Sequence, residues 1–275
     1  MRCAVLGSPI AHSLSPVLHR AAYAELGLDW TYEAVEVREP ELPAFVAGLD
    51  ATWRGLSLTM PLKRTVIDLL DVPEPLVQAT GVANTVVFDE GRRLGFNTDI
   101  PGSANAIRER GAGAVHSAIL LGGGATAASL GWALADLGCR NLRLFVRNLA
   151  TVAETVEVIA QHSLAPDVVV STFDDLDVMP RADLVASTIP VDAQNDELLL
   201  ALDRCDASLV FDVVYDPWPT PLARWASAGG RDVVTGLDLL CHQAALQVAL
   251  MTGHAPTVAG MRDAGLRALG AQESE

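Results

Sequence analysis

Lysine is almost missing from this chain of 275 residues. Of its 19 basic residues all but one are arginine, and the single lysine is Lys63. A general drift toward arginine explains the arginines, but it also predicts that a lysine without a special duty would have been replaced. Arginine cannot release its proton at working pH, whereas lysine can. Lys63 is therefore either a leftover surface residue or a group that transfers a proton.

Positive charge is scarce as well. The chain has 34 acidic residues against 19 basic ones, which gives a formal net charge of -15 and a pI near 4.7. Nucleic acids and anionic membrane surfaces are bound through basic patches, so this balance excludes both as main partners. An anionic ligand would need a local basic pocket.

Long apolar runs and paired cysteines are also absent. No run approaches the ~18 apolar residues of a membrane span, and residues 2–6 are typical of a strand rather than of a signal peptide. We therefore expect a cytoplasmic protein. Cys3, Cys139, Cys205 and Cys241 lie far apart without a CxxC pair, so we expect reduced thiols and neither a disulfide framework nor a metal site.

Strand-like and helix-like segments alternate along the first hundred residues. Strands are predicted at residues 2–6, 30–37 and 54–58, with helices from Ser15, after Pro40 and from Pro61. Ser15 followed by Pro16 is typical of a helix start, with serine as N-cap and proline at the first helical position. This alternation predicts a mainly parallel sheet.

A second series of strands follows a helix that begins near residue 101. The predicted strands are residues 117–121, 142–146, 167–170, 184–187 and 209–213. After Gly236 the pattern becomes helical, from 237 to 251 and again from 258. We expect an α/β protein of two domains, residues 1–101 plus 237–275 and a Rossmann-type domain of residues 102–236, with the C-terminal helices packing back on the first domain.

A GxGxxA motif follows the apolar strand at 117–121 and opens a helix. Gly122 allows a tight turn, Gly124 lets the backbone approach a pyrophosphate, and Ala127 permits close packing of helix on strand. The free N–H groups of such a helix start attract phosphates. The alternative is an ordinary strand-to-helix turn. The three consecutive glycines make this alternative the weaker interpretation.

The next strand ends in Arg147 and Asn148, without the acidic residue that binds the ribose hydroxyls of NAD. A guanidinium at this place pairs well with a 2′-phosphate, so NADP is the favoured cofactor and NAD a possible one. In so arginine-rich a chain, Arg147 can also be an ordinary surface residue. Thr151 stands where NADP-using relatives often carry a second basic residue, which weakens a strict preference.

Several short motifs follow one another in a specific order. They are GSPIAHSLSP at 7–16, LTMPLK at 58–63, GVANT at 81–85, NTD at 97–99, DVVY at 212–215 with TPL at 220–222, and GLDLL at 236–240 with Gln243. Each motif alone is weak. Their order and spacing closely resemble those of the shikimate dehydrogenase family over nearly the whole chain.

Members of that family reversibly reduce 3-dehydroshikimate to shikimate with NADPH, a step toward chorismate and the aromatic amino acids. The resemblance implies a substrate-binding and catalytic first domain with Lys63 and Asp99 as the catalytic pair. The implied substrate residues are Ser13, Ser15, Thr59, Lys63, Asn84, Asp99, Tyr215 and Gln243. The implied cofactor residues are Gly122, Gly123, Gly124, Ala125, Thr126, Ala127, Arg147, Asn148, Thr188, Val213 and Gly236.

Ketone reduction gives Lys63 a chemical role, because a proton must reach the developing alkoxide. We expect Lys63 to donate it during reduction and to accept it during oxidation. An ionised Asp99 nearby would raise the pKa of this lysine, while burial would lower it.

Other interpretations of the same residues stay open. Ser13 and Ser15 are also good caps, and Asn84 and Asp99 are common turn residues. Gln243 lies on an apolar helix, where a buried amide needs a partner. His12 is given no catalytic role.

Related functions stay open too. Rival functions are a quinate/shikimate or amino-shikimate dehydrogenase using NAD or NADP, and a noncatalytic NADP-binding sensor on the same fold. A folate-linked dehydrogenase is disfavoured by the serine pair and the NTD loop. We expect a monomer or a homodimer.

Overall fold

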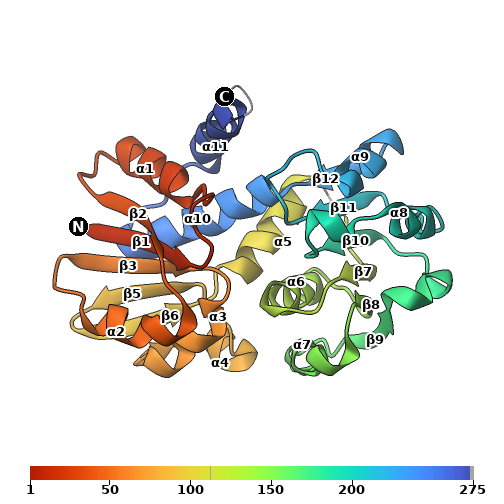
Figure 1. Cartoon of the computed structure of the whole chain (residues 1–275), viewed down its shortest axis with the longest axis horizontal. Helices are drawn as coiled ribbons and strands as arrows, with labels where there is room; N and C mark the ends of the chain where they lie inside the picture. The colour runs from red at the N-terminus through yellow and green to blue at the C-terminus, as the bar shows by residue number, and fades with distance from the viewer. Residues whose placement is uncertain (112, 273–275) are drawn as a thin grey trace. The chain divides into compact units, whose positions relative to one another are not determined.

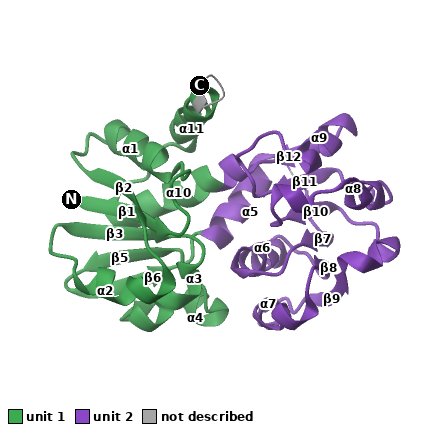
Figure 2. Ribbon diagram, viewed as in Figure 1, with its two compact units in different colours: residues 1–98, 240–275 green, residues 99–239 purple. Residues whose placement is uncertain are grey.

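The computed structural model describes residues 1–111 and 113–272. The chain forms two compact units, Met1–Thr98 with Leu240–Glu275, and Asp99–Leu239, coloured separately in Figure 2. The domain boundaries expected after residue 101 and before residue 237 each lie three residues from these unit boundaries. The first unit is discontinuous in sequence, as the returning C-terminal helices require.

The first unit contains a mixed sheet with the strand order β2-β1-β3-β5-β6-β4 (Figure 1). Its described strands are β1 Arg2–Gly7, β2 Thr31–Glu36, β3 Trp53–Leu58, β4 Val72–Pro73, β5 Thr85–Asp89 and β6 Arg92–Phe96. The prediction of a mainly parallel sheet is confirmed, because β1 pairs parallel with β2 and β3, and β4 pairs parallel with β6. Among the described strands of this sheet only β5 runs antiparallel, to its neighbours β3 and β6. Glu90 and Gly91, with φ angles of 49° and 76°, form the tight turn of the β5–β6 hairpin.

Helices cover this sheet, and α10 and α11 among them come from the C-terminal part of the chain. They are α1 Ser15–Glu25, η1 Glu39–Glu41, α2 Leu42–Ala47, α3 Leu62–Thr65, η2 Val66–Leu69, α4 Pro75–Thr80, α10 Gly236–Thr252 from Leu240 on, and α11 Val258–Gln272. Helix α11 packs against α1, which confirms that the C-terminal helices return to the first domain. The prediction of Ser15 as N-cap is wrong, because Leu14 occupies that position and Ser15 is the first helical residue.

The second unit is built on a fully parallel sheet with the strand order β12-β11-β10-β7-β8-β9. Its described strands are β7 Ser117–Leu121, β8 Asn141–Val146, β9 Asp167–Thr172, β10 Leu184–Ser187, β11 Leu209–Asp212 and β12 Asp232–Val234. Its helices are α5 Asp99–Glu109, α6 Ala125–Asp136, η3 Leu149–Thr151, α7 Ala153–Ala160, η4 Phe173–Val178, η5 Val191–Ala193, α8 Asp196–Leu202 and α9 Pro221–Ala228. The five predicted strands are confirmed, and the short edge strand β12 was missed.

Both faces of the central strands β7, β10 and β11 are buried, which explains their mostly apolar sequences. Ala118 and Leu120 of β7 point into a core shared with α6, while Ile119 and Leu121 point into the opposite core with α8 and α9. The chain order reverses direction between β7 and β10. In open parallel sheets, ligands bind at the carboxyl edge beside such a switch point. The fold therefore holds the glycine motif on a rigid support at that edge.

Among the residues that the structure describes, none of the helices combines the length and the apolar character that crossing a bilayer requires. Cys3, Cys139, Cys205 and Cys241 are buried and are not joined in disulfides.

Candidate active site

The glycine motif forms a tight turn at the carboxyl end of β7. Gly122 has a φ of 114°, which L-residues rarely adopt, and its N–H donates to the Phe145 carbonyl at 2.8 Å. A Cβ at this position would lie 2.2 Å from the Thr188 hydroxyl oxygen. Both the backbone angle and the neighbouring side chain therefore require glycine.

Gly124 occupies the N-cap position of α6 and is exposed. Apart from its chain neighbours and its own helix, no described atom lies within 4 Å of the place where its Cβ would be, so a ligand can approach the backbone there. Three residues later, the fully buried Ala127 packs into the core under the helix. The start of α6 thus combines open space with unpaired first-turn N–H groups, which suits a pyrophosphate.

A threonine that sequence reasoning missed supports this turn from α7. The Thr155 hydroxyl, with only 1% of its surface exposed, donates to the Gly123 carbonyl at 2.7 Å. It holds that carbonyl on the α7 side. The sequence offered no signal for this contact, because Thr155 lies some thirty residues beyond the motif on a separate helix.

Arg147 and Asn148 follow β8 on the surface. The Asn148 side chain accepts a hydrogen bond from the Ala150 N–H at 2.9 Å and caps η3, so it shapes the loop. The Arg147 side chain is exposed. An exposed guanidinium after the second strand of this sheet is placed to meet a phosphate.

The neighbouring strands bring Thr188 and Val213 to the same edge. The Thr188 hydroxyl donates to the Leu121 carbonyl at 3.1 Å, and the Val213 N–H donates to the Ser187 carbonyl at 3.1 Å. A Cβ on Gly236 would lie 2.1 Å from the Val213 carbonyl oxygen, so only glycine fits behind that segment. Tyr215 follows, half-buried.

In the first unit, Thr59 directly follows β3 and Lys63 lies one short turn later on α3. The Thr59 N–H donates to the Leu6 carbonyl at 2.9 Å, and the Ala83 N–H donates to the Lys63 carbonyl at 2.9 Å. Lys63 is half-buried on the short helix α3. The lysine is thus tied directly to the loop that precedes Asn84.

Asn84 is a buried residue whose amide orientation is fixed by its partners, so it is not an ordinary turn residue. Its Oδ1 accepts from the Thr98 N–H at 2.8 Å, the Thr98 hydroxyl at 3.1 Å and the Thr85 hydroxyl at 2.8 Å. A backbone N–H can only donate, so Oδ1 must be on this side. The Asn84 NH₂ group therefore points the other way and donates to Gln243 Oε1 at 3.4 Å.

A buried chain of hydrogen bonds behind Asn84 was also missed. The Tyr32 hydroxyl donates to Ser57 at 2.6 Å, Ser57 donates to Gln247 Oε1 at 2.8 Å, and Gln247 Nε2 donates to Thr85 at 3.1 Å. Thr85 then donates to Asn84, so every donor in the chain points toward that amide. The available signal was a second glutamine one helical turn after Gln243.

The two serines near the start of α1 have different local roles. The Ser13 hydroxyl accepts from the Ser15 N–H at 3.3 Å, so Ser13 supplies the local cap that was expected of Ser15. Ser15 is buried, and its carbonyl oxygen accepts from His19 Nδ1 at 2.9 Å.

Asp99 is the first residue of the second unit and of α5. It is 2% exposed and directly follows Thr98, the residue that orients Asn84. Its burial is unlike that of a solvent-exposed turn residue.

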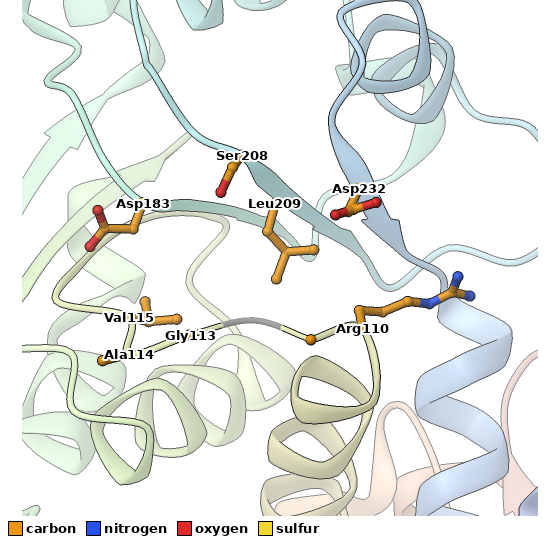
Figure 3. Close-up of a pocket in the computed structure, with 9 residues that line it drawn as sticks. Arg110, Gly113, Ala114, Val115, Asp183, Ser208, Leu209 and Asp232 are labelled. Atoms are coloured by element: carbon orange, nitrogen blue, oxygen red, sulfur yellow. The ribbon is translucent and has the colours of Figure 1, made fainter.

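A small pocket lies at the opposite, amino edge of the parallel sheet, lined by Asp183, Ser208 and Asp232 (Figure 3). The Asp183 carboxylate accepts from the N–H groups of His116 at 2.8 Å and Ser117 at 2.9 Å, so it binds the backbone at the start of β7. Binding at this edge would be remote from the glycine motif. Over residues 1–111 and 113–272, no cluster of three or more His, Cys, Asp or Glu side chains suits a metal ion.

Comparison with known proteins assigns the family. The shikimate dehydrogenase substrate binding domain matches residues 5–86, and the shikimate 5′-dehydrogenase C-terminal domain matches residues 236–264. The chain is 34% identical to the shikimate dehydrogenase (NADP(+)) of Thermus thermophilus, over 98% of this chain and 99% of that protein.

Solved structures agree with this assignment. The Mycobacterium tuberculosis shikimate dehydrogenase has a TM-score of 0.86 at 36% identity, covering 97% of this chain and 99% of that one. The Thermus thermophilus enzyme in complex with NADP(H) and shikimate has a TM-score of 0.87 at 33% identity, covering 98% and 100%. The chain belongs to the shikimate dehydrogenase family.

Proposed function

We propose that this protein is a shikimate dehydrogenase, an oxidoreductase that reversibly reduces 3-dehydroshikimate to shikimate with NADPH in chorismate and aromatic amino acid biosynthesis. The observation that carries the proposal is the fixed amide of Asn84 beside Gln243, in the same unit as Lys63. A small acid rich in hydroxyl groups offers few apolar atoms, so convergent hydrogen bonds must orient it.

Each substrate residue has a role in this proposal. Ser13 and Ser15 bind the carboxylate near the start of α1, where the positive end of the helix dipole also attracts an anion. The hydroxyl groups of the substrate are held by Thr59, Asn84, Asp99, Tyr215 and Gln243. The Asn84 NH₂ group donates to a substrate oxygen, because its Oδ1 is already occupied by Thr98 and Thr85.

Lys63 and Asp99 form the proposed catalytic pair. The nicotinamide cofactor, when bound, supplies the hydride for reduction and accepts it in oxidation. Lys63 donates a proton through Nζ to the developing alkoxide oxygen, and takes it back in the reverse direction. Asp99 is the proposed acidic partner of Lys63 in this pair.

NADP fits the second unit. The turn Gly122, Gly123 and Gly124, with Ala125, Thr126 and Ala127 at the start of α6, would hold the pyrophosphate. Arg147 would pair with the 2′-phosphate and Asn148 would shape its loop. Thr188, Val213 and Gly236 would line the carboxyl edge of the sheet beyond the glycine turn. NAD stays a possible alternative cofactor, because Thr151 supplies no second positive charge.

The proposed organisation follows from these roles. Residues 1–101 plus 237–275 form the substrate-binding and catalytic domain, and residues 102–236 form the Rossmann domain. We propose a cytoplasmic monomer or homodimer whose partners are its small-molecule ligands, with neither nucleic acid nor membrane among them, because net negative charge disfavours both.

The test is a four-way assay of shikimate and quinate oxidation with NADP and with NAD. Shikimate with NADP should give the highest kcat/KM of the four pairs. Faster quinate oxidation would identify a quinate dehydrogenase. NADP binding without turnover of either substrate would instead indicate a noncatalytic sensor.

A further inference from the structure

A buried carboxylate ends strand β11 without a role in the proposed chemistry. Asp212 is fully buried, and its Oδ2 accepts from the Thr220 hydroxyl at 2.7 Å and from Gln194 Nε2 at 2.9 Å. Its Oδ1 accepts from the Val214 N–H at 3.2 Å. Burial raises the pKa of Asp212, while these three donors act in the opposite direction. A buried charge persists only with such partners.

The partners of Asp212 are themselves tied to a third segment. Gln194, 3% exposed in the loop after η5, accepts from the Leu222 N–H through Oε1 at 3.0 Å. The Thr220 hydroxyl oxygen accepts from the Ala223 N–H at 3.0 Å and so caps α9. One carboxylate therefore joins the end of β11, the loop after η5 and the start of α9.

The segment between Asp212 and Thr220 contains two residues that are proposed to contact ligands. Val213 and Tyr215 lie between Asp212 and Thr220, and the Val213 carbonyl lies tightly against Gly236. Strand β11 is separated by β10 alone from β7, the strand that leads into the glycine motif. The segment thus emerges at the carboxyl edge where ligands bind in such sheets.

We propose that Asp212 and Gln194 are a pair of positioning residues that fix the Val213–Tyr215 segment against bound cofactor and substrate. The proposal rests on the dehydrogenase function proposed above. Both side chains are buried, and neither is proposed to contact a ligand. They act by holding the backbone that follows β11. Because Gln194 donates the hydrogen bond and Asp212 accepts it, substitutions that exchange donor and acceptor can test the pair.

The bond polarity predicts which substitutions fail. In Asp212→Asn an NH₂ group faces either the Val214 N–H or the donors from Gln194 and Thr220. In Gln194→Glu two carboxylates face each other. In the double variant, the new amide can accept from the Val214 N–H and donate to the new carboxylate, which can still accept from the Leu222 N–H. The Thr220 hydroxyl must rotate, so that its oxygen accepts the second amide hydrogen. The pair is therefore broken by either single change and restored by both.

The experiment measures binding of NADP and of adenosine 2′,5′-bisphosphate, which lacks the nicotinamide half, together with kcat, KM and thermal unfolding. Each single variant should lose about tenfold or more in NADP affinity or in kcat/KM, as expected for an unsatisfied buried polar group. The affinity of each single variant for adenosine 2′,5′-bisphosphate should stay within about twofold of the wild-type value. The double variant should recover most of the loss in NADP affinity or kcat/KM. Exposed Asp192→Asn and Gln161→Glu serve as matched controls.

Wild-type behaviour of the single variants would overturn the proposal. An equal loss of affinity for NADP and for adenosine 2′,5′-bisphosphate would also overturn it, because that pattern indicates a general loss of structure in the second unit. A double variant no better than the worse single variant would show that the two residues do not act together. The binding measurements need no turnover, so they stay informative even when the wild type fails to oxidise shikimate.

Discussion

At the scale of single residues, the chemistry depends on what each side chain can donate. Lys63 is half-buried, and its helix is tied by a backbone hydrogen bond to the loop before Asn84. A guanidinium in its place would keep the charge but lose the transferable proton. Replacing Lys63 by arginine therefore separates the effect of the positive charge from the effect of proton transfer.

Lys63→Ala should lower kcat by about 10²–10⁴-fold with little change in shikimate affinity, because general acid–base catalysis contributes that much. Lys63→Arg should be nearly as slow, since arginine retains its proton. Steady-state kinetics and equilibrium binding of shikimate check both variants. Turnover close to wild type in either variant would remove Lys63 from the proton-transfer step.

Arg147→Ala should raise KM for NADPH more than KM for NADH, because the proposed guanidinium contact exists only with the 2′-phosphate. The expected change for NADPH is about tenfold or more, the size of a lost charge-assisted hydrogen bond. Arg140→Ala is the control, an exposed arginine just before β8, at the other end of that strand. Equal changes with both cofactors would contradict the assignment.

Gln247→Glu should make activity and stability depend on pH. A protonated glutamic acid can still donate to Thr85, whereas the ionised form cannot, and burial raises the pKa of a carboxyl group. The variant should be closest to wild type at low pH and lose about 1–3 kcal/mol as pH rises through that pKa.

The free energy of unfolding and kcat/KM, measured between pH 5 and 9, check this expectation. Exposed Gln161→Glu should show no such dependence. A loss that is the same at every pH would mean that the hydrogen-bond direction at Gln247 has no influence.

At the scale of elements, His19 links α1 to the sheet. Its ring stacks on Tyr32 with centroids 3.8 Å apart, and Nδ1 lies 2.9 Å from the Ser15 carbonyl oxygen. Burial lowers the pKa of His19 to about 4, from an ordinary value of 6.5. Between pH 4 and 6.5, His19 is therefore mostly neutral in the folded protein and mostly protonated in the unfolded chain.

This difference makes the unfolded state gain protons as pH falls below 6.5, so stability should decrease by up to about 3 kcal/mol between pH 6.5 and 4 and then level off. Denaturant unfolding at several pH values measures it. In His19→Gln the decrease over this interval should be smaller. An unchanged pH dependence in that variant would assign the effect to other groups.

The elements also show how far sequence reasoning reaches. Strands β7, β10 and β11 of the second unit were predicted nearly to the residue, because both of their faces are buried and their sequences are mostly apolar. The β5–β6 hairpin was missed, because its ends carry polar motifs that resembled loops. Ser57, Thr155 and Gln247 were missed because their partners are distant in sequence, and only the fold brings them together.

At the scale of the whole molecule, each unit has a core of its own. Two apolar clusters of the second unit draw only on residues between Ala106 and Leu239, and one cluster of the first unit draws on residues between Ala4 and Phe88. A contiguous segment with a self-contained core is expected to fold alone.

Residues 99–239, expressed separately, should fold and bind NADP within about tenfold of the whole chain, but should not oxidise shikimate. Circular dichroism and fluorescence titration measure these properties, with Arg147→Ala in the same fragment as the control for 2′-phosphate recognition. A fragment that folds but does not bind NADP would contradict the proposed cofactor domain.

The near absence of lysine has a practical consequence for chemical labelling. The chain carries only two kinds of primary amine, its α-amino group and Lys63 Nζ. An amine-selective reagent that spares the N-terminus therefore marks one site, on a half-buried helix beside the proposed substrate residues. The rate of that labelling, with and without shikimate, would report occupancy of the site in an unmodified protein.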